Sequence, residues 1–185
     1  MQVKILIDLD DVLSHMVEYL LSQYNSEYKD TLDIKDINGW DLSKFVKKEC
    51  GERINMYFKR QKFFSNPKPR EDAQEVIEKL IKLGHEVHIV TSYCAEACFD
   101  KHRWIEDNFP FINNRNIIFC NNKNMIEGDV LIDDGLHNLK NFKGDKIVFD
   151  KPWNQNSDFK AIRVKDWHEI EILFTEKDIL WGENA

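Results

Sequence analysis

The chain has 185 residues, of which 42% are hydrophobic and 32% are charged, with a formal net charge of −7. These values predict one globular domain with room for an insertion, and they argue against a nucleic-acid polymer as the main partner, because no long stripe of Lys and Arg appears. No apolar run reaches the length of a membrane span, and four cysteines make no disulfide framework, so we expect a cytoplasmic protein with no membrane partner.

The first predicted element is a buried strand over residues 3–9, which runs directly into the carboxylates of Asp8, Asp10 and Asp11. Like charges this close repel each other, so a fold keeps the cluster only if a cation neutralises it or if the carboxylates do chemistry. Aspartates at a strand end also form ordinary turns and helix N-caps, and that alternative stays open for this motif taken alone.

The segment from residue 14 to 69 has a different character. It contains helix-like stretches at 15–28 and 43–64 and many aromatic residues. We interpret it as a small helical cap inserted after the first strand. The predicted core then consists of residues 1–13 and 70–185, and the cap of residues 14–69.

The remainder of the core alternates between helical patterns and short apolar runs rich in β-branched residues. This alternation predicts an α/β fold, a Rossmann-like parallel sheet with helices on both faces. Residues 154–185 show no clear pattern. The predicted helices span 70–84 and 96–109, and the predicted strands span 86–92, 116–120, 129–133 and 146–150.

Polar residues stand where three of the predicted strands end. Ligands of such sheets bind beyond the carboxyl ends of the strands, so we expect these side chains to converge at one edge of the sheet. The three sets are Asp8 with Asp10, Thr91 with Ser92, and Asp133 with Asp134.

Four motifs in this order resemble those of the haloacid dehalogenase (HAD) superfamily of phosphotransferases: "DLDDV" at 8–12, "IVTS" at 89–92, Lys123, and "GDVLIDD" at 128–134. With "FFSNPKPREDA" at 63–73, the chain resembles the 5'(3')-deoxyribonucleotidase family. The resemblance covers roughly residues 1–150. It implies an enzyme, a Mg²⁺-dependent phosphatase that forms an aspartyl-phosphate.

The substrate implied by the resemblance is a small phosphorylated molecule, a deoxyribo- or ribonucleoside monophosphate. Two alternatives stay open: a HAD phosphatase that acts on another small phosphorylated metabolite, and a binding module without catalysis. A homodimer also stays open.

The resemblance assigns the catalytic and metal-binding roles to four aspartates. Asp8 would be the nucleophile, and Asp10 would be the general acid and base. The Mg²⁺ ion would be held by Asp8, by the backbone carbonyl of Asp10 and by Asp133. Asp134 would support the metal's waters or hold the motif lysine.

The phosphate-binding role falls on Thr91, Ser92 and Lys123 in the same resemblance. The hydroxyls would donate hydrogen bonds to phosphate oxygens, and the lysine would neutralise charge on the transferring group. Taken singly, a Thr-Ser pair is most often a helix cap, and a loop lysine is most often solvated.

A substrate pocket is expected in the cap. Trp40, Phe63 and Phe64 would form an apolar slot for a base, and Met16 stands where the mammalian deoxyribonucleotidases carry a pocket phenylalanine. The alternative is that these aromatics pack the cap's own small core.

Several residues depart from the family pattern or stand outside it. Asp11 occupies a position where many members have glycine, and we favour a helix-capping role for it. Gly135 replaces an arginine that helps to position the nucleotide in the mammalian enzymes. Cys94, Cys98 and His102 lie four residues apart, which suggests either a zinc site or, in our preferred interpretation, a helix face packed on the sheet.

Overall fold

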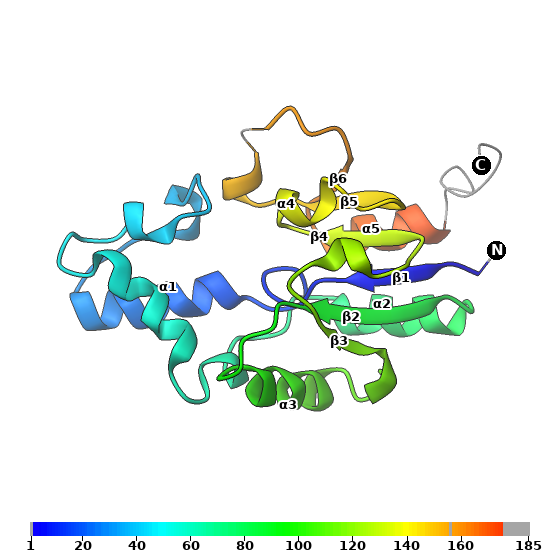
Figure 1. Cartoon of the computed structure of the whole chain (residues 1–185), viewed down its shortest axis with the longest axis horizontal. Helices are drawn as coiled ribbons and strands as arrows, with labels where there is room; N and C mark the ends of the chain where they lie inside the picture. Colours follow the sequence, from blue (N-terminus) through cyan, green and yellow to red (C-terminus); the bar gives the residue numbers. More distant parts are fainter. Residues whose placement is uncertain (1, 156, 176–185) are drawn as a thin grey trace.

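The computed structural model describes residues 2–155 and 157–175. Within them, one six-stranded parallel sheet has the strand order β3-β2-β1-β4-β5-β6 (Figure 1), which confirms the predicted α/β class. The first strand of the chain therefore lies in the middle of the sheet, between β2 and β4. The strands are β1 Lys4–Ile7, β2 Glu86–Thr91, β3 Ile117–Phe119, β4 Val130–Asp133, β5 Asp145–Phe149 and β6 Ile162–Val164.

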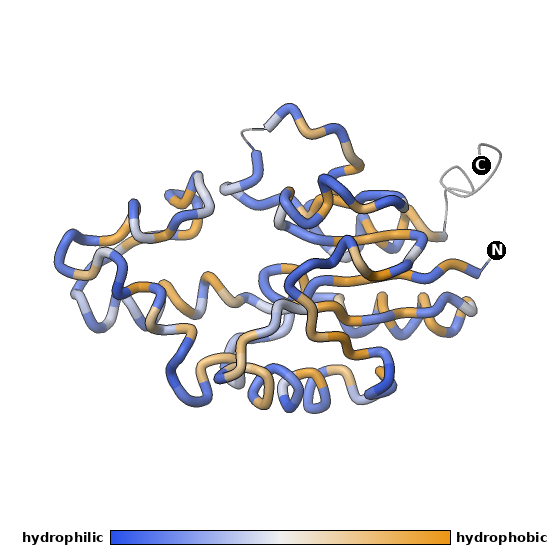
Figure 2. The backbone as a smooth tube through the Cα atoms, in the orientation of Figure 1, coloured by the Kyte–Doolittle hydropathy of each residue, from blue (hydrophilic) through white to orange (hydrophobic). Residues whose placement is uncertain are grey.

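Both faces of the sheet are covered, which explains why most residues of its strands are apolar (Figure 2). Successive side chains of β1 point to opposite faces. Ile5 and Ile7 join the larger apolar cluster, to which helices α2 (Ala73–Lys82), α3 (Cys98–Asn108) and α5 (Trp167–Thr175) contribute. Leu6 joins a separate cluster on the other face with Leu139 of helix α4 (Leu136–Leu139).

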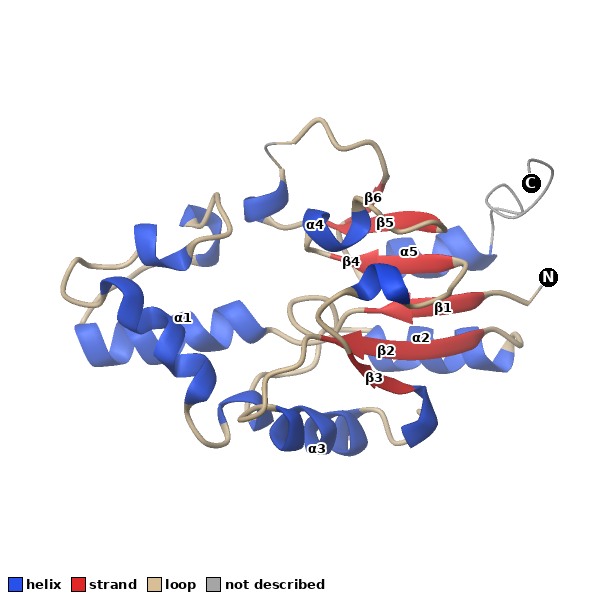
Figure 3. Ribbon diagram, in the orientation of Figure 1, coloured by secondary structure: helices blue, strands red, loops and turns tan. Residues whose placement is uncertain are grey.

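Residues 14–69, the helical segment, lie beyond the carboxyl ends of the strands (Figure 3). The segment has an apolar cluster of its own, which includes Leu20, Ile54 and Phe63. The two stretches of chain that connect it to the sheet run side by side, since Ser14 and Pro69 form an antiparallel bridge. Its elements are helix α1 Met16–Tyr28 and the 3₁₀ turns η1 Ile34–Asp36, η2 Leu42–Lys44, η3 Gly51–Lys59 and η4 Phe63–Ser65.

Two regions differ from the sequence-based expectation. The helix expected over 43–64 is wrong as one element, because Gly51 and Lys62 adopt φ of +46° and +59° and interrupt the chain between 3₁₀ turns. Strand β6 and helix α5 form where the sequence showed no pattern. Three further 3₁₀ turns are η5 Asn114–Asn116, η6 Lys123–Met125 and η7 Pro152–Asn154.

None of the helices in residues 2–155 and 157–175 combines the length and the apolar character needed to cross a membrane.

Candidate active site

The ends of three neighbouring strands form the floor of the site. Asp8 directly follows β1, Thr91 ends β2 and Asp133 ends β4. The backbone N–H of Asp8 donates to the carbonyl of Ile132 over 2.9 Å, so the two carboxylate-bearing strands end in register. The expected convergence of polar residues at one sheet edge is therefore present.

Lys123 lies between two of these carboxylates. Its Nζ is 2.5 Å from Oδ1 of Asp8 and 2.7 Å from Oδ2 of Asp133, and its side chain is buried. Burial by itself would lower the pKa of this lysine, but the two carboxylates outweigh burial and raise the pKa. Lys123 therefore stays charged and is not the solvated loop lysine of the alternative interpretation.

Asp8, Asp133 and Asp134 form a buried carboxylate cluster, in which one oxygen from each lies within 4.8 Å of the others. Burial raises the pKa of Asp8 and of Asp134 well above the usual range, and neighbouring carboxylates raise both further. One lysine compensates only part of this charge. An all-oxygen set with excess negative charge fits a hard divalent cation such as Mg²⁺.

The turn after β4 holds Asp133 in place. Its Oδ1 accepts a hydrogen bond from the backbone N–H of Gly135 over 2.7 Å, and the Asn138 amide donates to both of its oxygens over 3.1 and 3.2 Å. A Cβ at position 135 would lie 2.9 Å from Cε1 of the His137 side chain, so a larger residue here would require that side chain to shift. Sequence reasoning missed Asn138, because only the turn brings its amide back to the carboxylate.

A second buried lysine, Lys101 of α3, contacts the other half of the site. Its Nζ lies 2.5 Å from Oδ2 of Asp10 and 2.9 Å from Oγ1 of Thr91. Sequence reasoning missed this residue too. A signal existed, because Lys101 is three and four positions before the buried residues Trp104 and Ile105, which puts a charge on the apolar face of the helix.

Asp11 caps helix α1 from outside, as the favoured interpretation expected. Its Oδ1 accepts from the backbone N–H of Val17 over 2.9 Å, and its own carbonyl accepts from Arg70 Nε over 3.0 Å. Its φ of +60° lies in the left-handed region, where glycine is more usual. Burial, reinforced by the nearby charge of Glu18, raises the pKa of Asp11 to about 8.

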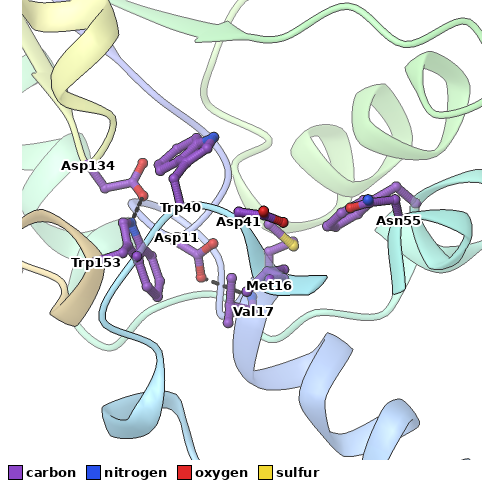
Figure 4. A pocket seen from close by; sticks show the side chains of 11 residues that line it. Asp11, Met16, Val17, Trp40, Asp41, Asn55, Asp134 and Trp153 are labelled. Carbon is purple, nitrogen blue, oxygen red and sulfur yellow. Dashed lines mark hydrogen bonds between the residues drawn. The ribbon is translucent and has the colours of Figure 1, made fainter. Parts of the chain in front are cut away.

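A pocket of about 380 Å³ lies between the helical segment and the sheet edge (Figure 4). Met16 and Trp40 line it, as does Asp134 of the carboxylate cluster. Trp153, from the turn after β5, lines the same pocket and donates its indole N–H to Oδ2 of Asp134 over 2.7 Å. The pocket therefore connects directly to the acidic site.

The expectation that Phe63 and Phe64 form the slot is not met, because the structure places them outside the pocket lining. Both are buried in the apolar cluster of the helical segment, where their ring centroids are 5.1 Å apart. Phe63 also contacts Tyr19 and Phe58. These two side chains supply the core that supports the wall of the pocket.

The cysteine and histidine series does not share a helix face, since α3 begins at Cys98 and Cys94 precedes it in a turn. Cys94 packs at the edge of the helical segment's cluster, and His102 pairs with Glu106 over 3.5 Å. Among the described residues, the aspartate cluster is the only group of three or more His, Cys, Asp or Glu placed to share a metal ion.

Solved structures of known proteins share this architecture. A haloacid dehalogenase-like hydrolase from Streptococcus pneumoniae superposes with a TM-score of 0.62 at 14% identity, covering 94% of this chain and 98% of that one. A HAD hydrolase from Bacillus subtilis, solved bound to magnesium, gives a TM-score of 0.60 at 12% identity, covering 94% and 99%. At these identities the likeness establishes the HAD fold alone.

Sequence relatives are closer. The 5'(3')-deoxyribonucleotidase of Clostridium acetobutylicum is 41% identical over 167 residues, which are 90% of this chain and 92% of the relative. The 5'(3')-deoxyribonucleotidase of Bacillus subtilis is 36% identical over 169 residues, covering 90% and 95%. The family model described as "5' nucleotidase, deoxy (Pyrimidine), cytosolic type C protein" matches residues 1–179. The chain therefore belongs to the 5'(3')-deoxyribonucleotidase family of HAD hydrolases.

Proposed function

We propose that this hydrolase removes phosphate from nucleoside monophosphates with the help of Mg²⁺. The observation that carries the proposal is a buried nucleophile candidate, Asp8, which is ion-paired with Lys123 and clustered with Asp134, a residue that lines a pocket together with two tryptophans. Relatives named as deoxyribonucleotidases support the substrate class. A family description that includes the words pyrimidine and cytosolic supports a deoxypyrimidine nucleotide and a cytoplasmic location.

The metal site would be formed by the carboxylates of Asp8 and Asp133 and by the backbone carbonyl of Asp10, with Asp134 holding the metal's waters. The oxygen-only donors and the raised pKa values of the buried carboxylates fit Mg²⁺. When bound, the ion supplies positive charge that lets an anionic nucleophile approach an anionic phosphate.

The reaction proceeds in two displacements at phosphorus. An oxygen of Asp8 attacks phosphorus, the ester P–O bond breaks, and the leaving oxygen keeps the electron pair and takes a proton from the Asp10 carboxyl group. Asp10 then takes a proton from water, which attacks the aspartyl-phosphate. The bond from Asp8 to phosphorus breaks, and inorganic phosphate leaves with Asp8 restored.

The phosphate oxygens are bound by the Thr91 hydroxyl, by Ser92 and by the Lys123 ammonium. Thr91 is buried at the end of β2, and Ser92 follows it in an exposed loop. Lys123 already contacts the nucleophile. Its ammonium can therefore stabilise the negative charge that develops on the transferring phosphoryl group without first changing position.

The helical segment, residues 14–69, acts as the cap, and residues 1–13 and 70–185 act as the catalytic core. The separate apolar cluster of this segment and its paired connections at Ser14 and Pro69 support this division. The nucleoside would occupy the pocket between the two parts, with Trp40 and Met16 on the cap side.

A second candidate function is hydrolysis of another small phosphorylated metabolite. Gly135 favours it, because the arginine that positions the nucleotide in the mammalian enzymes is missing here. The pocket keeps aromatic residues in its lining, which suit the base of a nucleotide and have no matching aromatic group in a sugar phosphate, so nucleotides stay the first choice.

A substrate screen tests the proposal. Phosphate release is measured with Mg²⁺ from dUMP, dTMP, ribonucleoside monophosphates and sugar phosphates, for the wild type and for Asp8→Asn. We expect the highest kcat/KM on a nucleoside monophosphate, and loss of turnover in the folded variant. A clear preference for sugar phosphates would favour the second function, and an undiminished rate in Asp8→Asn would contradict the mechanism.

A further inference from the structure

Lys101 is a buried lysine that the four family motifs do not include. It stands in the first turn of α3 and points inward, with its side chain almost wholly buried. Its ammonium has three N–H donors and three acceptors nearby: Oδ2 of Asp10 at 2.5 Å, Oγ1 of Thr91 at 2.9 Å and the carbonyl of Ser92 at 3.5 Å. Its hydrogen-bonding capacity is thus fully used within the site.

The helical segment covers this ammonium. The ring of Phe64 lies 4.6 Å from Lys101 Nζ, and Phe64 is itself buried in the segment's apolar cluster. An apolar ring in this place excludes water and stabilises the cation through its face. It also strengthens the pairing with Asp10, because the pair lies in a less polar surrounding than water.

The two buried lysines divide the site between them. Lys123 contacts Asp8 and Asp133, the nucleophile and metal side, whereas Lys101 contacts Asp10 and Thr91, on the side where the leaving oxygen must be protonated. The Asp10 side chain is 21% exposed, and within residues 2–155 and 157–175 its carboxylate is oriented by the ion pair with Lys101.

We propose that Lys101 is a positioning residue, whose ammonium contacts both the Asp10 carboxylate and the Thr91 hydroxyl and holds Asp10 so that it faces the leaving oxygen. The inference rests on the proposed function, in which Asp10 transfers the proton. Proton transfer requires a heavy-atom distance of about 2.6–3.2 Å. Misplacement of a catalytic group by about 1 Å costs on the order of 100-fold in rate.

The same contact orients Thr91. Because the lysine donates to Oγ1, the Thr91 hydroxyl keeps its own hydrogen free to donate to a phosphate oxygen. A single ammonium group of Lys101 thereby fixes both the proton donor, Asp10, and a residue that binds the phosphate, Thr91, without contacting the substrate itself.

Leaving-group dependence tests this role. The alkoxide that leaves a nucleoside monophosphate is a strong base and needs a proton, whereas the nitrophenolate that leaves p-nitrophenyl phosphate needs none. For Lys101→Met we expect kcat on dUMP to fall about 100-fold and kcat on p-nitrophenyl phosphate to fall only a few fold. Lys101→Arg, which keeps the charge, should restore part of the rate on dUMP.

Two other roles predict different results. If Lys101 bound the phosphate directly, its replacement by Met would raise KM and lower kcat/KM on both esters alike. If Lys101 only compensated buried charge, its replacement by Met would lower the melting temperature and leave the ratio of the rates on the two esters unchanged. Either result would overturn the positioning role.

Controls separate this inference from the proposed function. Asp10→Asn should show the same leaving-group selectivity, more strongly. If Asp10→Asn lacks that selectivity, Asp10 is not the proton donor, and both the proposed function and the inference fail. If Asp10→Asn shows the selectivity but Lys101→Met does not, the inference alone is overturned. Arg103→Met, which removes an exposed cation paired with Glu106 from the same helix, should change neither rate.

A second variant covers the case in which Lys101→Met does not fold. Lys101→Gln keeps a hydrogen-bond donor of similar reach without the charge, and we expect the same selectivity with a smaller loss on dUMP. An equal loss on both esters in the folded Lys101→Gln protein would overturn the proposal.

Discussion

The sheet edge and the helical segment place their functional side chains in opposite ways. At the sheet edge, the side chains of Asp8, Lys123 and Asp133 are at most 9% exposed and are joined by short ion pairs. In the helical segment, Trp40 is 61% exposed and touches the sheet side through an edge contact with His137, with ring centroids 4.8 Å apart. The groups that we propose carry the chemistry are fixed, and the group that we propose meets the nucleoside is left room to adjust.

The backbone explains this difference. The ends of β1, β2 and β4 are hydrogen-bonded to neighbouring strands of a buried sheet, so the side chains at these ends are held rigidly. The helical segment has one long helix, α1, and otherwise consists largely of short 3₁₀ turns. Its order comes from a small apolar core of its own, separate from the clusters that cover the sheet.

The largest expected effect comes from the sheet edge. Asp133→Asn removes a charge from the carboxylate cluster and weakens the pairing with Lys123. We expect kcat/KM to fall by more than about 100-fold and the Mg²⁺ requirement to rise, since loss of even an outer partner of a metal site costs about 10–100-fold. Steady-state rates across a Mg²⁺ titration measure this.

Asp129→Asn is the matched control for that variant, because Asp129 stands at the amino end of the same strand and accepts from the backbone N–H of Lys4. It should leave the Mg²⁺ requirement unchanged. An equal rise of the Mg²⁺ requirement in Asp133→Asn and Asp129→Asn would show that this rise comes from a less stable strand and not from the metal site.

The next effect concerns the core of the helical segment. Phe63→Ala removes a buried ring and should lower the free energy of unfolding by about 3–5 kcal/mol. Urea denaturation measures the loss, with Met56→Ala as the exposed control on η3, which should change it by less than about 0.5 kcal/mol. A small loss for Phe63→Ala would contradict its assignment to the segment's core.

Trp40→Ala should act on binding and not on stability, because the ring is mostly exposed. Base–aromatic contacts are worth about 1–3 kcal/mol, so we expect KM for dUMP to rise about tenfold while the melting temperature stays within about 1 °C. Trp40→Phe should recover most of the affinity. Turnover of glycerol phosphate, which has no aromatic ring to stack on Trp40, should be unchanged, and a parallel rise in its KM would refute the role in base binding.

The smallest effect lies where the two regions meet. Glu18 of α1 accepts from His15 over 3.1 Å and from Arg70 over 3.0 Å. Burial opposes ionisation of Glu18, but these partners outweigh it and lower its pKa to about 2. A lowered pKa stabilises the fold above the unfolded value of about 4.5, and the stabilisation is lost as pH falls towards 2.

Glu18→Gln should therefore reduce the free energy of unfolding at pH 7 by about 1 kcal/mol, a value discounted for partial exposure. The difference from the wild type should vanish as the pH is lowered from about 4.5 to 2. Denaturation at several pH values measures it, with Glu49→Gln as an exposed control in the same segment. A difference that persists at pH 2 would show that packing is responsible and not charge.

The sequence predicted the sheet more completely than the helical segment. The five strands that it indicated all form, because short apolar runs between helices are typical of a parallel sheet that is covered on both faces. The break-up of residues 43–64 was missed, since helical propensity does not reveal that Gly51 and Lys62 turn the chain. Strand β6 was also missed, because a three-residue strand carries little pattern.

What the sequence by itself determined was the set of acids at the strand ends and their order, because parallel strands deliver adjacent positions to one edge whatever surrounds them. Tertiary structure alone decided which of the three predicted aromatics lines the pocket, Trp40 and not Phe63 or Phe64. It also decided that a lysine of α3 contacts Asp10. Those contacts join residues up to 91 positions apart, and their geometry depends on how separate elements pack.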